Sequence, residues 1–268
     1  MKRMSKALAG ILVLVFLLSI IPAPAMAYSE SQLNTADALF HLGLFLGTGT
    51  TYALDENLTR EQGIILLVRM LGAEKTAMDS NAKHPFTDVS DWASPYVGYA
   101  YREGITNGTG KTTFSGTLAM TDQMFLTLCI RAIGYSDLGW KHDFSYDDVW
   151  SFAASLGLID STAHNQNFTR GETVEIFWRL LNLRVKNNRK TLADKLIGQG
   201  VFTRAQWNEA VTIQAEGRDP NEDDTGEQTV VPPTIPTPPP VVTPKPTATP
   251  TPSPVPTDSR SDIETPRF

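Results

Sequence analysis

A short phrase occurs three times in this chain of 268 residues, and each time it opens an apolar run with helical spacing. The copies are Leu58-Thr59-Arg60-Glu61-Gln62, Met120-Thr121-Asp122-Gln123-Met124 and Phe168-Thr169-Arg170-Gly171-Glu172. An arginine follows each threonine at the same distance, at Arg69, Arg131 and Arg179. Three copies of one helix make an internal repeat. Such a repeat limits the fold to similar units that pack against one another, because one unit cannot bury its own apolar face.

Each phrase has the chemistry of a helix start. Thr169 with Glu172 predicts a capping box, and Thr59 with Gln62 predicts the same box in amide form. Thr121 lacks this partner, since Met124 occupies the position. We expect Glu61 and Glu172 to serve their helix starts, and the three late arginines to form salt bridges near the negative helix ends. Three residues in one register are expected to stop the helices: Gly72, Gly134 and Asn182.

A second helical segment precedes each phrase and ends at a glycine. The segments are 36–43, 96–104 and 150–157. Glycine-rich loops, 47–49 and 108–110, follow the first two, whereas the third copy has Ser161-Thr162-Ala163 and a shorter loop. Each unit therefore reads as helix, loop, helix. A further helical pattern at 192–215 contains Thr203-Arg204-Ala205-Gln206 without a preceding loop, and we expect a closing helix there.

Composition excludes several classes of protein. The single cysteine, Cys129, rules out an internal disulfide framework, and its alignment with Leu67 and Phe177 predicts a buried core position. The four histidines are far apart and lack metal-ligand spacing, so we expect neither a metal site nor a cofactor. The net charge of −6 gives no general attraction to nucleic acid or to an acidic membrane. An anionic partner would need local binding sites.

The two ends of the chain differ from its middle. Residues 1–27 combine an early basic cluster, an apolar run at 11–21 and small residues at Ala25 and Ala27, which predicts a signal peptide and export, with no membrane segment after cleavage. Of the 18 prolines, 14 fall between Pro220 and Pro266. Such a segment cannot build a core, so 218–268 is predicted to be a disordered Pro/Thr-rich stalk and tail.

The repeats resemble the S-layer homology (SLH) family. That family's pattern is Phe-x-Asp-Val, Trp-Ala, a helix, Gly-Ile or Gly-Leu, a Gly-x-Gly loop, and Thr-Arg-Ala-Glu at the second helix. The second repeat of this chain carries most of it, as Phe86-Thr87-Asp88-Val89, Trp92-Ala93, Gly104-Ile105 and Gly108-Thr109-Gly110. The first repeat has Gly47-Thr48-Gly49 and Thr59-Arg60-Glu61, and the third has Phe144, Gly157-Leu158 and Thr169-Arg170-Gly171-Glu172. The resemblance covers about 29–201.

The resemblance implies an all-α fold, in which three helix-loop-helix repeats form a pseudo-trimeric bundle with grooves between the repeats. The expected organisation is a signal peptide at 1–27, repeats at 28–78, 79–138 and 139–190, a closing helix at 191–217 and the stalk at 218–268. It also implies a surface protein that is not an enzyme. Such a protein binds non-covalently to a secondary polysaccharide linked to peptidoglycan, commonly through a pyruvyl group of that polymer.

The physical chemistry of the phrase fits an anionic ligand. A helix start favours an anion, and an arginine one residue inside it adds a planar fork suited to a carboxylate. We therefore expect Arg60 and Arg170 to bind the polysaccharide, with Trp92 stacking on a sugar ring. The glycine loops are expected to shape the same grooves, through Gly47, Gly49, Gly108 and Gly110.

The second repeat departs from the pattern, because Asp122 stands where the other two copies have arginine. An aspartate stabilises its own helix start but repels an anion, so we expect the groove at this helix to be weak or silent. Two other readings stay open. The carboxylates could belong to a hydrolase, although no separate catalytic domain has room. The chain could also be the anchoring part of a longer surface enzyme or S-layer protein.

Overall fold

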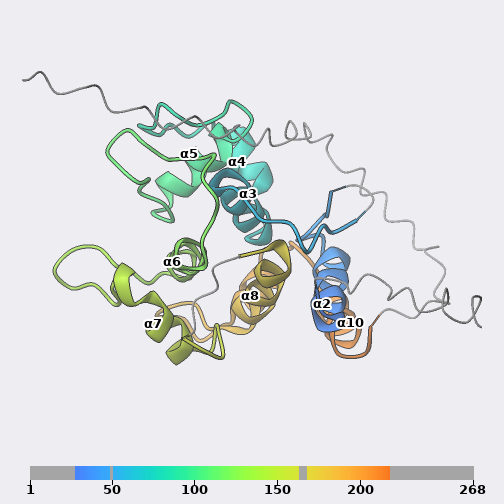
Figure 1. Ribbon diagram of the computed structural model, residues 1–268. Coiled ribbons are helices and arrows are strands. Elements are labelled where there is room, and N and C mark those ends of the chain that lie inside the picture. Colours follow the sequence, from blue (N-terminus) through green and yellow to red (C-terminus); the bar gives the residue numbers. More distant parts are fainter. Residues whose placement is uncertain (1–27, 49–50, 163–167, 218–268) are drawn as a thin grey trace, which may run out of the picture. The chain divides into compact units, whose positions relative to one another are not determined.

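A computed structural model describes residues 28–48, 51–162 and 168–217 (Figure 1). These residues belong to one compact unit, which spans 1–227. The predicted signal peptide, Gly49 and the predicted stalk at 218–268 lie outside the described residues. Within the described part the chain is helical, and no helix there is long and apolar enough to cross a membrane. Three isolated β-bridges are present, but no strand is found in this part.

The helices occur in the order that the repeat predicts, with additions. Their bounds are α2 (Glu30–His41), α3 (Arg60–Met70), α4 (Glu74–Ser80), α5 (Ser94–Arg102), α6 (Asp122–Ala132), the 3-10 helix η1 (Tyr146–Asp148), α7 (Val149–Leu156), α8 (Arg170–Asn182), α9 (Leu192–Gly198) and α10 (Arg204–Glu216). The short helix α4 was not expected from the sequence. The all-α class is confirmed for the described residues.

The three phrases begin helices as predicted. Helices α3, α6 and α8 each start directly after the threonine, and all three threonines have the extended backbone of an N-cap. Gln62 accepts a hydrogen bond from the Thr59 N–H at 2.8 Å, and Glu172 accepts one from the Thr169 N–H at 2.7 Å. Thr121 caps through the Met124 N–H alone, at 3.2 Å. Sequence spacing therefore fixes these helix starts.

Two of the three expected stop residues end their helices. Gly72 and Gly134 have φ values of +64° and +98°, a backbone conformation that side chains resist. The prediction for Asn182 was wrong, because this residue is the last one inside α8 and Leu183 then turns to extended backbone. The expected closing helix was also wrong in part. It is two helices, α9 and α10, and Thr203 caps the second of them through Gln206.

Packing pairs helices from different repeats. Helix α5 packs on α3, α7 packs on α6, and α2 packs on α8. Figure 1 shows α2 and α10 side by side, in agreement with their contacts, so α10 covers α2. The starts of α3 and α8 each contact a loop from a different repeat, through the backbone N–H groups of Arg60 and Arg170.

Residues that align between the three phrases are buried alike in the core. The residues before the three threonines, Leu58, Met120 and Phe168, are all buried. Cys129 is fully buried like the aligned Leu67 and Phe177, and burial raises the pKa of its thiol well above the usual value. The late arginines form the expected salt bridges, which are Arg69–Glu74, Arg131–Asp137 and Arg179–Asp160.

Candidate functional site

Arg60 lies almost completely buried at the start of α3, with 5% of its surface exposed. Its guanidinium stacks over the ring of Phe114, 4.7 Å from the centroid, and its Nε donates to the Phe114 carbonyl oxygen at 2.9 Å. Phe114 belongs to the loop that follows α5, in the second repeat. The loop of one repeat therefore holds the arginine of another.

Arg170 repeats this arrangement at the start of α8. It is 8% exposed, its guanidinium stacks over Phe45 at 4.9 Å, and its Nε donates to the Tyr52 carbonyl oxygen at 2.8 Å. Both partners come from the loop that follows α2. One difference matters: the Arg170 Nη2 is buried and has no hydrogen-bond partner in the described structure. A buried charged donor without an acceptor is costly, so this nitrogen has unused capacity for an anionic group.

Burial affects the ionisation of both arginines. It lowers the pKa of Arg170 to about 10 and lowers the pKa of Arg60 in the same direction. Nearby Tyr146 and Asp88 partly offset this effect for Arg60, and Glu56 does so for Arg170. Both side chains remain cations at neutral pH. The protein thus holds two positive charges in poorly hydrated positions, where their attraction to an anion is stronger than in water.

The first backbone N–H groups at these two helix starts are already occupied. The N–H groups of Arg60 and Glu61 donate to the carbonyl oxygens of Leu118 and Gly116, at 2.9 and 3.0 Å. Those of Arg170 and Gly171 donate in the same way to loop residues 56 and 54. Because neighbouring loops occupy these donors, an anion here would be held by the arginine side chains and the helix dipole.

The glycine loops have matching geometry. Gly47 and Gly108 have φ values of +67° and +73°. A Cβ at either position would lie within 2.7 Å of a backbone carbonyl oxygen in its own loop, Thr51 O for Gly47 and Thr113 O for Gly108, so both positions require glycine. The same carbonyl oxygens accept from the N–H groups of Thr48 and Thr109, each at 2.8 Å. Gly110 lies beside Thr113, and Trp92 is partly buried against the core.

Two acidic residues beside Arg60 were not predicted as part of the site. Asp88 accepts hydrogen bonds from the Phe114 and Ser115 N–H groups, which lowers the pKa of its carboxyl group. The expectation that Glu61 serves its helix start was wrong, because its carboxylate accepts from the Ser90 N–H and hydroxyl at 2.8 and 2.9 Å. Asp88 thus fixes the loop that carries Phe114, and Glu61 fixes the segment before α5 that carries Ser90. The Phe86-Thr87-Asp88-Val89 motif was the signal that could have revealed Asp88.

The start of α6 has the opposite charge. Asp122 accepts a hydrogen bond from the Trp150 Nε1 at 2.9 Å and lines a cavity of about 340 Å³ between α6, α7 and α8. Glu172 and Glu175 line the same cavity, and burial raises the pKa of both carboxyl groups. Among the described residues of its lining the one cation is Arg179, which is paired with Asp160. Among the described residues, no cluster of His, Cys, Asp and Glu is arranged to hold a metal ion.

Comparison with known families gives a match in the second repeat. Residues 85–121 match the family model of the S-layer homology domain, from the loop before α5 to the N-cap of α6. The match includes Asp88, Gly108 and Phe114, so the loop that holds Arg60 lies within the matched segment.

Of three relatives, two carry names of cell-surface or cell-wall proteins, and the third carries the name of an enzyme. A cell surface protein of Thermoanaerobacter kivui is 29% identical over 183 residues, which cover 65% of this chain and 23% of the relative. A middle cell wall protein of Brevibacillus brevis is 31% identical over 148 residues, or 52% and 13% of the two chains. An endoglucanase of Bacillus sp. strain KSM-635 is 30% identical over 117 residues, or 39% and 12%. The chain matches less than a quarter of the length of each.

Proposed function

We propose that this protein is a non-covalent anchor at the bacterial cell surface, and that it binds an anionic polysaccharide of the cell wall. The SLH domain and the surface-protein relatives support the location and the class of function. A peptidoglycan-linked secondary polysaccharide with pyruvyl carboxylates fits the chemistry of the site, because a guanidinium pairs well with a carboxylate.

One observation carries the proposal. Two buried guanidiniums, Arg60 and Arg170, are held by an aromatic ring and a loop carbonyl through Nε, and no carboxylate within the described residues forms an ion pair with either. Proteins rarely bury a cation without a counter-ion. The unpartnered Arg170 Nη2 makes the α8 start the stronger candidate for a carboxylate.

The proposal includes three helix-loop-helix repeats with unequal grooves. The pairing of α5 with α3, of α7 with α6 and of α2 with α8 supports this architecture. Asp122 and the two glutamates nearby make the α6 groove unsuitable for an anion, so binding rests on the α3 and α8 grooves. Gly47, Gly49, Gly108, Gly110 and Trp92 stay in the proposal as residues that shape the grooves.

The match to an endoglucanase bears on the alternative that this chain is the anchoring part of a longer surface protein. That match covers only 12% of the endoglucanase. A shared segment of this small size agrees with a binding role. We therefore propose no enzymatic activity for the SLH region. Neither nucleic acid nor a membrane is proposed as a partner.

Co-sedimentation with purified walls tests the function. The full chain should sediment with walls that keep their secondary polysaccharide and remain in solution with walls stripped of it. Equal sedimentation with both preparations would refute polysaccharide binding. On a polymer whose acidic substituents have been removed, the affinity should fall sharply if carboxylates are the groups recognised.

A further inference from the structure

The loop between α6 and α7 carries the most exposed large apolar side chain in the described part of the chain. Trp140 is 85% exposed and Leu138, two residues earlier, is 54% exposed. Figure 1 shows this loop extending away from the helices. A single exposed apolar residue is ordinary, but an indole exposed to this extent on a loop is unusual, since tryptophan is highly buried on average.

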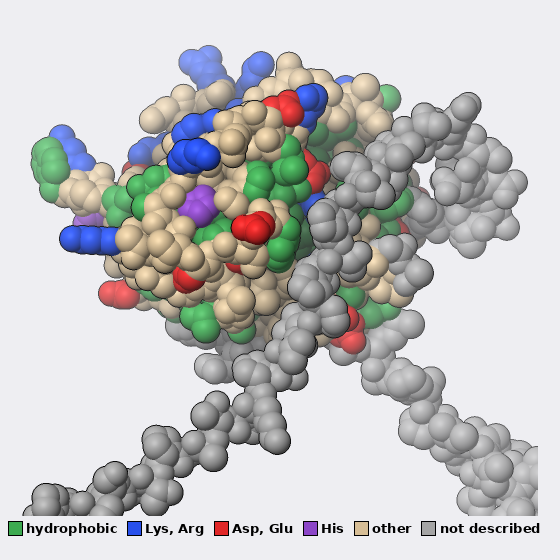
Figure 2. All heavy atoms as spheres, turned by 90° about the horizontal axis from the view of Figure 1, so that it is seen from above, with side chains coloured by type: hydrophobic (Ala, Val, Ile, Leu, Met, Phe, Trp, Pro, Cys, Tyr) green, Lys and Arg blue, Asp and Glu red, His purple; other side chains and the backbone are tan. Residues whose placement is uncertain are grey.

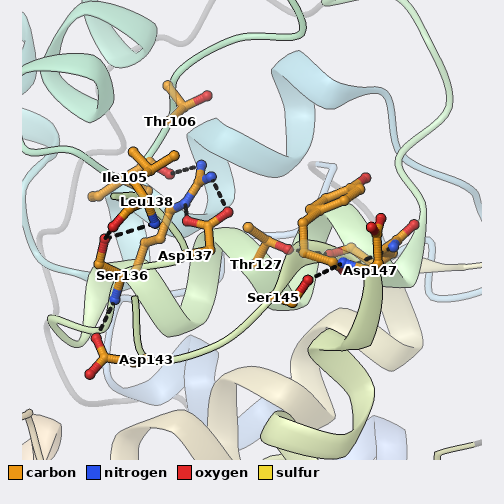
Figure 3. Close-up of polar contacts among 12 residues, drawn as sticks. Ile105, Thr106, Thr127, Ser136, Asp137, Leu138, Asp143, Ser145 and Asp147 are labelled. Carbon is orange, nitrogen blue, oxygen red and sulfur yellow. Dashed lines mark hydrogen bonds and ion pairs between the residues drawn. The ribbon is translucent and has the colours of Figure 1, made fainter. Parts of the chain in front are cut away.

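The base of the loop is fixed by several polar contacts (Figure 3). The Asp143 N–H donates to the Ser136 carbonyl oxygen at 2.6 Å, and the Ser136 N–H donates back to the Asp143 carboxylate at 2.7 Å. Asp143 also pairs with Lys186, and Asp137 pairs with Arg131. These contacts close residues 137–142 into a defined loop. The exposed indole is therefore presented from a preorganised frame, which lowers the entropic cost of binding.

The charges leave a cation beside the indole. Both acidic residues of the loop are neutralised by their ion pairs. The Lys141 ammonium lies over the Trp140 ring, 4.5 Å from its centroid, in cation–π geometry. Because the side chain stays 85% exposed, most of the indole surface is open to solvent beside this ammonium donor.

A polar pocket lies at the foot of the same loop. Its volume is about 300 Å³, and Asp143 belongs both to the pocket wall and to the base of the loop. The rest of the lining combines hydroxyls, a carboxylate and two aromatic rings: Ser145, Ser151, Ser155, Asp148, Phe144 and Phe152. On the face seen in Figure 2, basic side chains lie mainly toward the top and the left of the view, while acidic ones are scattered.

An exposed indole on a loop whose base borders a pocket of hydroxyl and carboxylate groups matches the chemistry of a pyranose. The C–H face of the sugar stacks on an aromatic ring, and its hydroxyl edge exchanges hydrogen bonds with serines and aspartates. A bilayer fits less well, because insertion of the tip would bring the Asp148 carboxylate toward the lipid head groups. An anionic sugar is disfavoured by the same carboxylate.

We propose that the Trp140 loop and this pocket form an additional saccharide subsite, which takes an uncharged pyranose unit of the wall glycan. The inference rests on the proposed function for the source of its ligand. It does not depend on Arg60 or Arg170, which lie at other helix starts. It would let the anchor hold the polymer at a second point and gain avidity from two weak contacts.

The test uses the full chain and polysaccharide released from walls by hydrofluoric acid. Trp140→Ala should weaken binding by about 5- to 10-fold, the effect of removing one good interface anchor. The matched control is Met78→Ala, which removes another exposed apolar side chain, 53% exposed on α4, and should leave binding unchanged. Because Trp140 is exposed, the variant should keep the thermal unfolding of the parent.

A second readout separates this subsite from the arginine grooves. Polysaccharide whose acidic groups have been removed should still quench tryptophan fluorescence in the parent and not in Trp140→Ala. If Trp140→Ala binds like the parent while Arg170→Ala loses affinity, the subsite is refuted and the proposed function stands. If Trp140→Ala instead abolishes binding to phosphatidylglycerol vesicles and leaves polysaccharide binding intact, the loop contacts lipid, and the inference is wrong.

Discussion

At the residue scale, the same helix position carries two different arrangements in the three copies. Arg60 and Arg170 are buried under a phenylalanine ring and donate to a loop carbonyl, whereas Asp122 accepts from an indole N–H. From the sequence we predicted that the two copies with arginine bind an anion and that the copy with aspartate does not. It could not show the burial of the arginines, because Phe45 and Phe114 reach them from loops of other repeats.

Asp122→Arg should not create a third anion site. The change removes the acceptor of the Trp150 Nε1–H and places a cation at a positive helix end, so we expect a loss of about 1 to 2 kcal/mol in unfolding free energy. Chemical denaturation of the variant measures this. Asp122→Asn is the control, since it keeps an acceptor and should lose less. Equal stability of Asp122→Arg and the parent would contradict the assigned role.

Arg170→Met should weaken binding to walls while leaving the stability of the fold nearly unchanged. The methionine fills similar volume and removes a buried charge with an unpartnered Nη2, so stability should change by no more than about 1 kcal/mol. Wall affinity should fall at least about 10-fold, as for the loss of a charged contact. Calorimetry and co-sedimentation of the same preparation give both values. A variant that binds walls like the parent would remove Arg170 from the site.

At the scale of elements, the packing of α5 depends on a close approach that the sequence did not reveal. A Cβ added to Gly98 would lie 1.9 Å from the Ala82 carbonyl oxygen, a backbone atom that can move only if the chain itself shifts. Gly198, in α9, has no neighbouring atom within 4 Å of an added Cβ. The two glycines look alike in the sequence, and only the tertiary fold distinguishes them.

This difference predicts opposite effects of one substitution. Gly98→Ala should destabilise the protein by about 2 kcal/mol or more, because α5 must move away from residue 82. Gly198→Ala should stabilise it by about 0.5 to 1 kcal/mol, because alanine favours the helix and meets no obstacle. Thermal unfolding of the pair measures both effects. If both variants shifted the melting temperature in the same direction and by the same amount, the described packing of α5 would be contradicted.

The ion pair at the base of the Trp140 loop should make stability depend on pH. The Lys186 ammonium holds the pKa of the Asp143 carboxyl below its usual range, so the folded state favours the carboxylate. This contribution is present above a pH of about 4 and is lost as the pH falls through the folded pKa. Asp143→Asn should therefore lower the melting temperature at pH 7, with a difference that narrows toward pH 2. If the two melting temperatures differed by the same amount at every pH, the ion pair between Asp143 and Lys186 would be contradicted.

At the scale of the whole molecule, the sequence predicted the helix starts, the late salt bridges and the buried Cys129, because each depends on residues close in the chain or in register. It missed α4, the division of the last helical segment and the role of Glu61. Those features depend on contacts between distant segments, such as Glu61 with Ser90. The repeat thus defines the elements, while the site itself forms only when loops of one repeat reach the helix starts of another.

The central claim is that the arginines at the starts of α3 and α8 hold an anionic wall polysaccharide. The most direct measurement is the affinity of Arg60→Ala, Arg170→Ala and the double variant for walls that carry this polymer, with Asp122→Ala as the matched control. We predict that each arginine variant binds more weakly, that the double variant loses sedimentation with the walls, and that Asp122→Ala binds like the parent. Unchanged affinity in a folded double variant would contradict the account.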